Sequence, residues 1–397
     1  MTKLADRICR LSESATLAMS QKSRELREQG IDVINLSIGE PDFNTPEHIK
    51  DAAKKALDEN FTRYSPVPGY PELRKAISEK FKRENNLDYA IDEIIVSTGA
   101  KNSISNVIMC LVNHGEEVIM PAPYWVSYKE IVMLARGEAI VLPTSIVSNF
   151  KITAEQLEKA ITPKSKILIF SSPCNPTGSV YSKEELRAIA EVVAKYEDLF
   201  IISDEIYEHI NFVGKHESIA QFDFIKDRVI TVNGVSKGYA MTGWRIGYIG
   251  APKWIVKACD KLQGQLTSGT NSIAQRASIA ALQSGDDFIN TMRATFKHRR
   301  DLVLSLLADV PGIKTNVPDG AFYIFADASY YIGKNANGTI INNMGDLSIY
   351  LLNNAHVALV PGEAFGDPNC IRFSYATSDD LIIESVKRVK SALSNIQ

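Results

Sequence analysis

The chain has 397 residues, which is too long for one hydrophobic core, so we expect two domains. With 45% hydrophobic and 23% charged residues, its composition is that of an ordinary globular protein. The formal net charge of −3 argues against binding to nucleic acid or to an anionic membrane. No apolar run approaches the ~20 residues of a membrane helix, and no signal-peptide pattern indicates secretion. Five scattered cysteines and six unclustered histidines argue against disulfides and a metal site, and favour a cytoplasmic location.

The N-terminal part is predicted to contain helices separated by loops. An amphipathic helix is expected at 15–29 and a short strand at 31–38. Prolines open two further helices, one at 46–60 and one that begins at Pro71. The segment between them, 63–69, is too rich in proline to form either element.

From residue 93 onward, strands and helices alternate. Strands 167–170 and 200–203 are continuous apolar runs, as expected for strands covered by helices on both faces. The alternation predicts an α/β domain with a mostly parallel sheet, whose ligand lies beyond the carboxyl ends of the strands. The predicted elements are strand 93–97, a helix, strand 117–120, helix 125–135, strand 138–142, helix 153–161, strand 167–170, helix 182–196 and strand 200–203.

The C-terminal part is predicted to be α+β. A long helical region at 252–310 leads to it, and a polar insertion at 331–343 has no explanation. Alternation in the last strand turns Arg372 away from the face that bears Ile371 and Phe373. The remaining predicted elements are strand 320–325, helix 345–354, strands 356–360 and 370–375 and a final helix.

A lysine stands in an unusual place after the apolar run 229–232. The turn dipeptide Asn233-Gly234 ends that run, and Lys237 and Arg245 follow among glycines. Burial lowers the pKa of a lysine and turns it into a nucleophile for carbonyls, and a guanidinium suits a phosphate. The pair therefore indicates pyridoxal 5′-phosphate (PLP). A β-hairpin with a surface lysine explains this stretch alone equally well.

Other predicted strand ends carry groups that suit the same ligand. The segment 98–101 (Thr-Gly-Ala-Lys) opens a helix, whose N-terminus can bind an anion. Asp204 is costly to bury unless it is paired, and a pyridinium nitrogen is a natural partner. Trp125, Asn175 and Tyr207 add an aromatic face, an amide and a phenol. Each has an ordinary alternative explanation as a cap, turn or packing residue, but together they supply what an aromatic aldehyde phosphate requires.

The chain resembles the fold-type-I, class I PLP-dependent aminotransferases, nearest to the bacterial aspartate and prephenate branch, in a spaced set of motifs: GEPDF (39–43), TGAK (98–101), PYW (123–125), SPCNPTG (172–178), SDEIY (203–207), SKGYAMTGWRIGY (236–248) and IRFSYAT (371–377). The resemblance implies an N-terminal segment (1–47) that contributes to a small domain, a large PLP-binding domain (48–290) with a mostly parallel seven-stranded sheet flanked by helices, and a small C-terminal α+β domain (291–397). It also implies a homodimer with shared active sites.

The resemblance also assigns roles to single residues. Lys237 forms the internal aldimine, Asp204 holds the ring nitrogen, and Tyr207 completes the catalytic set. The other cofactor-binding residues are Gly99, Ala100, Lys101, Ser236 and Arg245 for the phosphate, Trp125 and Asn175 for the ring, and Tyr64 from the partner subunit. The substrate-binding residues are Gly39, Trp125, Asn175, Arg372, Lys101 and Thr16. Some branches have a phosphate-binding serine where this chain has Gly234, which weakens the assignment of Ser236.

The expected reaction is a ping-pong transamination between L-aspartate, or a similar acidic amino acid, and 2-oxoglutarate, with pyridoxamine 5′-phosphate after the first half. In the aspartate branch a lysine at the position of Lys101 meets the distal carboxylate, and hydroxyls such as Ser14 and Thr16 assist. Both hydroxyls could equally be helix caps. The alternatives are a prephenate or aromatic aminotransferase, a carbon–sulfur lyase, a decarboxylase and a non-catalytic PLP-binding regulator.

Overall fold

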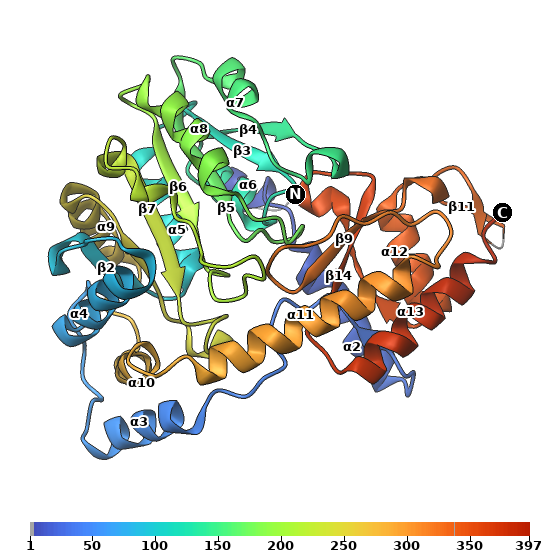
Figure 1. Ribbon diagram of the computed structural model, residues 1–397, viewed down its shortest axis with the longest axis horizontal. Coiled ribbons are helices and arrows are strands. Elements are labelled where there is room, and N and C mark those ends of the chain that lie inside the picture. The colour runs from blue at the N-terminus through green and yellow to red at the C-terminus, as the bar shows by residue number, and fades with distance from the viewer. Residues whose placement is uncertain (1–3, 337) are drawn as a thin grey trace.

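A seven-stranded sheet forms the centre of the larger part of the molecule in this computed structural model, which describes residues 4–336 and 338–397 (Figure 1). The strand order is β2-β8-β7-β6-β5-β3-β4. In this sheet β8 (Gly247–Gly250) runs opposite to the other six strands. The other strands are β2 (Ile94–Ser97), β3 (Glu117–Ala122), β4 (Glu138–Pro143), β5 (Ser165–Ser171), β6 (Phe200–Asp204) and β7 (Val229–Gly234). The predicted mostly parallel sheet is confirmed.

Helices cover both faces of this sheet, as β5 shows. Its Ile167 and Ile169 pack into one apolar cluster with α5, α6 and α9, whereas Leu168 and Phe170 pack into another with α3, α4, α8 and α10. Burial on both faces explains why the strand is apolar at consecutive positions. The covering helices are α3 (Glu47–Asp58), α4 (Pro71–Lys80), α5 (Ala100–Leu111), α6 (Ser127–Leu134), α7 (Ala154–Ala160), α8 (Lys183–Ala194), α9 (Lys253–Leu266) and α10 (Ser272–Leu282).

A smaller α+β part joins this layer through the long helix α11 (Asp287–Leu307) (Figure 1). It contains the antiparallel sheet β13-β14-β9 and a separate parallel pair, β1 with β12. Because β1 comes from the N-terminal segment, both ends of the chain build this part. Its elements are α1 (Asp6–Cys9), α2 (Ala15–Glu28), β1 (Ile34–Asn35), β9 (Tyr323–Asp327), α12 (Met344–Asn354), β12 (Val357–Ala358), β13 (Val360–Pro361), β14 (Cys370–Ser374) and α13 (Asp379–Leu393). The domain limits at 47/48 and 290/291 stay a prediction.

Several predicted elements differ from the structure. The strand expected at 31–38 is reduced to β1, because the N–H of Ser37 bonds to the side chain of Asn35 and not to a neighbouring strand. The helical region 252–310 is divided into α9, α10 and α11. The polar insertion forms the hairpin β10 (Asn335–Ala336) and β11 (Thr339–Ile340), apart from residue 337, which lies outside the described residues. Among the described helices, none is long and apolar enough to cross a membrane.

The turn predicted at Asn233-Gly234 is also wrong. Both residues continue β7, where Gly234 pairs with Gly247 of β8. A Cβ on Gly234 would lie 2.7 Å from the carbonyl oxygen of Ile246, so glycine allows the two strands to approach each other here. The chain turns only after Gly234, and Lys237 lies in that connection.

Candidate active site

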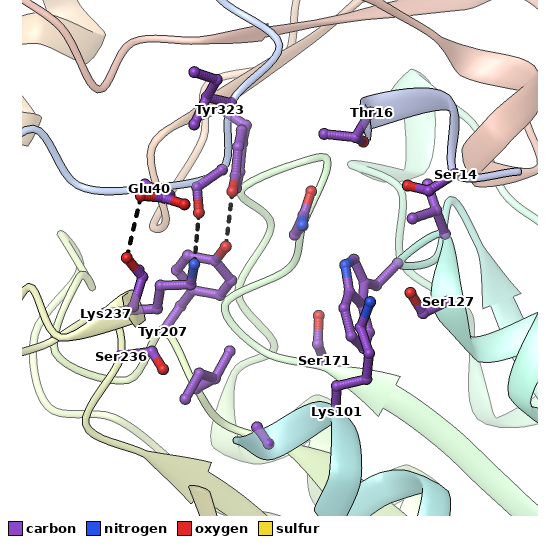
Figure 2. A pocket seen from close by; sticks show the side chains of 18 of the residues that line it. Ser14, Thr16, Glu40, Lys101, Ser127, Ser171, Tyr207, Ser236, Lys237 and Tyr323 are labelled. Atoms are coloured by element: carbon purple, nitrogen blue, oxygen red, sulfur yellow. Dashed lines mark hydrogen bonds between the residues drawn. The ribbon is translucent and has the colours of Figure 1, made fainter. Parts of the chain in front are cut away.

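The carboxyl ends of β2, β3, β5, β6 and β7 meet at one edge of the sheet, as predicted. The strand register pairs Ser171 with Asp204, and Asp204 with Val232. A cavity of about 530 Å³ lies there, between the sheet edge and the smaller part of the molecule (Figure 2). Its walls include most of the residues that the sequence proposed: Ser14, Thr16, Gly39, Ala100, Lys101, Trp125, Asn175, Asp204, Tyr207, Ser236, Lys237, Arg245 and Arg372.

Two predicted site residues do not line this cavity. Gly99 lies behind the wall at the N-cap of α5, with φ = 83°. A Cβ at this position would collide with the guanidinium of Arg245, so the glycine allows Arg245 to lie against the helix N-terminus. Tyr64 lies on the loop 63–69 with its side chain 99% exposed. Its predicted role requires a second subunit.

Lys237 projects into the cavity from the connection between β7 and β8. Its Nζ donates a hydrogen bond to the carbonyl oxygen of Gly39, at 2.5 Å (Figure 2). Burial is the main cause that lowers the pKa of Lys237 to about 8; the guanidiniums of Arg245 and Arg372 act in the same direction, and the Glu40 carboxylate acts against it. A substantial fraction of the amine is therefore neutral near physiological pH, which is the form that attacks a carbonyl.

Asp204 ends β6 at the floor of the cavity and is only 4% exposed. One carboxylate oxygen accepts a 2.6 Å hydrogen bond from the Tyr128 hydroxyl, and the other accepts the N–H of Ile206. Burial raises the pKa of Asp204 to about 6 although both hydrogen bonds act in the opposite direction. A cationic partner in the cavity would hold this carboxyl in its ionised form.

Arg372 is buried in the opposite wall, at 2% exposure. Its Nη1 donates to the side-chain oxygen of Asn175 at 2.9 Å, and its Nη2 donates to the carbonyl oxygen of Ser37 at 2.6 Å. The buried Nε has no partner among the described residues. The guanidinium lies between the rings of Tyr323 and Phe365, 4.5 and 5.0 Å from their centroids. A buried guanidinium with donor capacity remaining suits a carboxylate ligand.

Comparisons with known proteins agree with this geometry. A family model described as "Aminotransferase class I and II" matches residues 31–389. The chain belongs to this aminotransferase family. Among its relatives, a bifunctional aspartate aminotransferase and glutamate/aspartate-prephenate aminotransferase of Petunia hybrida is 47% identical over 99% of this chain and 83% of its own. A probable aspartate/prephenate aminotransferase of Rhizobium leguminosarum bv. phaseoli is 47% identical over 98% of both chains.

Solved aminotransferase structures share the whole fold. The aspartate aminotransferase from Rhizobium meliloti superposes with a TM-score of 0.96 at 42% identity and covers 100% of both chains. The enzyme from Thermus thermophilus with maleate gives a TM-score of 0.93 at 39% identity, covering 99% of this chain and 100% of the other. The chain is therefore an aminotransferase of fold type I that depends on PLP, as the sequence predicted.

The aminotransferase cavity offers PLP a complementary group on three sides. The first turn of α5 presents free N–H groups beside Arg245, which is a setting for a phosphate. Asp204 can pair with a protonated ring nitrogen, and the partly neutral Lys237 can reach a carbonyl carbon. The collision that a Cβ at Gly99 would cause shows that space here is reserved for Arg245. The donor set therefore fits the cofactor.

Residues that the sequence did not single out also build the aminotransferase site. Tyr128 supports Asp204, and the hydroxyl of Tyr323 lies 2.8 Å from that of Tyr207. Both tyrosines stand within apolar patterns, so they look like ordinary core residues. Glu40 accepts a 3.1 Å hydrogen bond from Thr242 at the rim of the cavity. Glu40 follows Gly39 inside the motif GEPDF, and this position in the sequence could have indicated that it belongs to the site.

Proposed function

We propose that this aminotransferase transfers the amino group of L-aspartate, or a similar acidic amino acid, to 2-oxoglutarate by a ping-pong mechanism. The observation that carries the proposal is a cavity with cationic side chains on two walls. Arg372 reaches the cavity from β14 and Lys101 reaches it from α5. Figure 2 shows Lys101 on the same side of the cavity as Ser14 and Thr16. A substrate with two carboxylates can pair with both cations.

The Lys101 wall supports binding of a distal carboxylate. The Lys101 Nζ lies 5.0 Å from the Trp125 ring centroid, and burial lowers the pKa of this amine, helped by the nearby Arg245. Although Lys101 is exposed in the open cavity, a carboxylate that binds beside its amine would favour the charged form. Ser14 stands at the N-cap of α2, where its side chain makes no capping hydrogen bond, so its hydroxyl is available to the cavity.

The roles of the remaining site residues follow from their places. When bound, PLP supplies a carbonyl for condensation with amines and a ring that withdraws electrons from the substrate α-carbon. Asp204 keeps the ring nitrogen protonated, and Asn175 and Tyr207 donate to the ring oxygen. Trp125 covers one ring face. The phosphate is held by the backbone of Gly99, Ala100 and Lys101 and by Ser236 and Arg245.

At the α-carbon end of the substrate, the groups that act directly are Arg372, Gly39 and Lys237. Arg372, with Gly39, binds the α-carboxylate and orients the α-carbon toward Lys237. The neutral amine of Lys237 then takes the α-proton as a general base. The same amine gives the proton back as a general acid. The two halves of the reaction use the same cavity, so donor and acceptor must both fit it.

The proposal includes a homodimer in the cytoplasm. Tyr64, with an almost fully exposed side chain, would reach the phosphate site of the partner subunit. The cytoplasmic location follows from the scattered cysteines. Prephenate is a second candidate substrate because relatives at 47% identity are named aspartate/prephenate aminotransferases. A carbon–sulfur lyase or a regulator has no support among these relatives.

The substrate assignment is tested with Lys101→Met, which keeps the backbone at the phosphate site. Loss of a charge-assisted hydrogen bond of about 1.5–3 kcal/mol should lower kcat/KM for L-aspartate by about tenfold to a hundredfold. L-Phenylalanine, which lacks the distal carboxylate, should be affected far less. Lys183→Met, in the first turn of α8 and outside the cavity, is the matched control. An equal loss for both substrates would contradict the proposed role of Lys101.

A further inference from the structure

Tyr323 connects two of the ligand-binding groups in the cavity. It is the first residue of β9, is fully buried and reaches the cavity with its hydroxyl (Figure 2). That hydroxyl lies 2.8 Å from the Tyr207 hydroxyl, and the ring lies 4.5 Å from the guanidinium carbon of Arg372. One side chain therefore contacts the predicted partner of the cofactor ring oxygen and the predicted partner of the substrate carboxylate.

The hydroxyl of Tyr323 has little freedom. A Cβ on Gly39 would lie 2.7 Å from it, so the tyrosine oxygen occupies the space that any other residue at 39 would fill. Burial raises the pKa of both phenols, which keeps Tyr207 and Tyr323 protonated. The pair thus holds two protons but forms one mutual hydrogen bond. When Tyr323 donates to Tyr207, the proton of Tyr207 is left to point at a ligand.

The ring of Tyr323 has a separate task. Arg372 is held between this ring and Phe365, while its Nη atoms bond to Asn175 and Ser37. An aromatic face beside a desolvated guanidinium stabilises the cation and fixes its plane. The carboxylate-binding edge of Arg372 consequently depends on the ring of Tyr323 and not on its hydroxyl.

We propose that Tyr323 is a positioning residue of the transamination site: its hydroxyl orients the Tyr207 hydroxyl toward the cofactor, and its ring orients Arg372 toward the substrate carboxylate. The inference rests on the proposed roles of Tyr207 and Arg372. Because the hydroxyl of Tyr323 acts on Tyr207 and the ring acts on Arg372, Tyr323→Phe and Tyr323→Leu should have different effects.

The hydroxyl is tested by titrating the visible absorption of the PLP-loaded enzyme with pH. A hydrogen-bond donor to the ring oxygen favours the unprotonated form of the lysine–cofactor linkage. A weaker donor therefore raises the pH at the midpoint of this titration. In Tyr323→Phe we expect the midpoint to rise by about 0.3–0.5 unit, about two- to threefold in proton affinity. Lys237, Asp204, Arg372 and Glu40, which also face this region, are unchanged in the variant.

The control is Tyr350→Phe, which removes the hydroxyl of another buried tyrosine, one that donates to the carbonyl oxygen of Ala392 outside the cavity. Its midpoint should equal that of the wild type. The hydroxyl role is overturned if the midpoint of Tyr323→Phe does not move, or if Tyr350→Phe moves it as far.

The ring is tested with maleate, an unreactive dicarboxylate, whose dissociation constant is read from the same absorption band. Tyr323→Phe should bind maleate as the wild type does, whereas Tyr323→Leu should bind it about threefold to thirtyfold more weakly. Equal affinity in Tyr323→Leu and the wild type would overturn the ring role. A wild-type enzyme with no cofactor band at all would instead contradict the proposed function, and this inference with it.

Discussion

Tyr128 offers a quantitative test of how the protein prepares Asp204 for the cofactor. Its hydroxyl donates to Asp204 at 2.6 Å, deep in the site. The substitution Tyr128→Phe removes this donor and leaves the ring in place, including its edge-to-face contact with Trp125 at 5.5 Å. The perturbation is therefore close to the loss of one hydrogen bond to a buried carboxylate.

The size of the effect follows from that hydrogen bond. A hydrogen bond to a buried charge contributes about 1.5–3 kcal/mol, and 1.36 kcal/mol corresponds to one pKa unit. Its loss should raise the pKa of Asp204 by about one to two units above the present value of about 6. At pH 7 the variant must then deprotonate Asp204 before it can pair with a cationic ring nitrogen, which weakens PLP binding by about twofold to tenfold.

The assay is the dissociation constant of PLP from the apoprotein, measured by absorbance at pH 7 and pH 9. The deficit of Tyr128→Phe relative to the wild type should be present at pH 7 and nearly absent at pH 9, where Asp204 is ionised in both proteins. Tyr181→Phe, which removes a buried hydroxyl that accepts from the N–H of Ile152, is the control. A deficit of the same size at both pH values would refute the reasoning.

Three further predictions concern the lysines and a helix cap. Lys80 is fully buried and paired with Glu208, so Lys80→Met should lower the free energy of unfolding in urea by about 3–5 kcal/mol. The buried Glu208 carboxylate then loses its lysine and keeps the Asn85 amide and, at 3.7 Å, His209; a loss below about 1 kcal/mol would contradict this. The pKa of Lys237, lowered to about 8, means that PLP capture by the apoprotein should accelerate as pH rises through 8 and then level off; an inflection near 10 would contradict it. Ser182 caps α8 by accepting from Glu185, so Ser182→Ala should lower stability by about 1 kcal/mol in thermal unfolding with turnover unchanged, and a fall in turnover would count against a purely local cap.

The architecture of the sheet could be predicted because a strand that is buried on both faces has apolar residues at consecutive positions. The consecutive apolar residues of β5 and β6 indicate parallel strands under helices, and both strands are buried as expected. The direction of β8 could not be predicted in the same way, because an apolar run looks alike in either orientation. Asn233-Gly234 resembled a turn, but the requirement there is space against Gly247, which depends on a strand pairing that no local pattern reveals.

In the site, too, some residues could be predicted from the sequence and others could not. Lys237 and Asp204 could be recognised because charged groups directly after apolar strands need a reason to be there. Tyr128 and Tyr323 could not, because each fits the apolar pattern of its own element. Their importance comes from partners 76 and 116 residues away, Asp204 and Tyr207 respectively. Such roles become visible only when the chain is folded.

The most direct test of the account is the visible spectrum of the purified PLP-loaded protein before and after L-aspartate is added without any 2-oxo acid. We expect the absorption band of the lysine-bound cofactor to be replaced by that of pyridoxamine 5′-phosphate, with one oxaloacetate formed per site. A band that stays in place with L-aspartate but converts with L-phenylalanine would contradict the acidic donor. A protein that shows no band even with excess PLP would contradict the central role of Lys237.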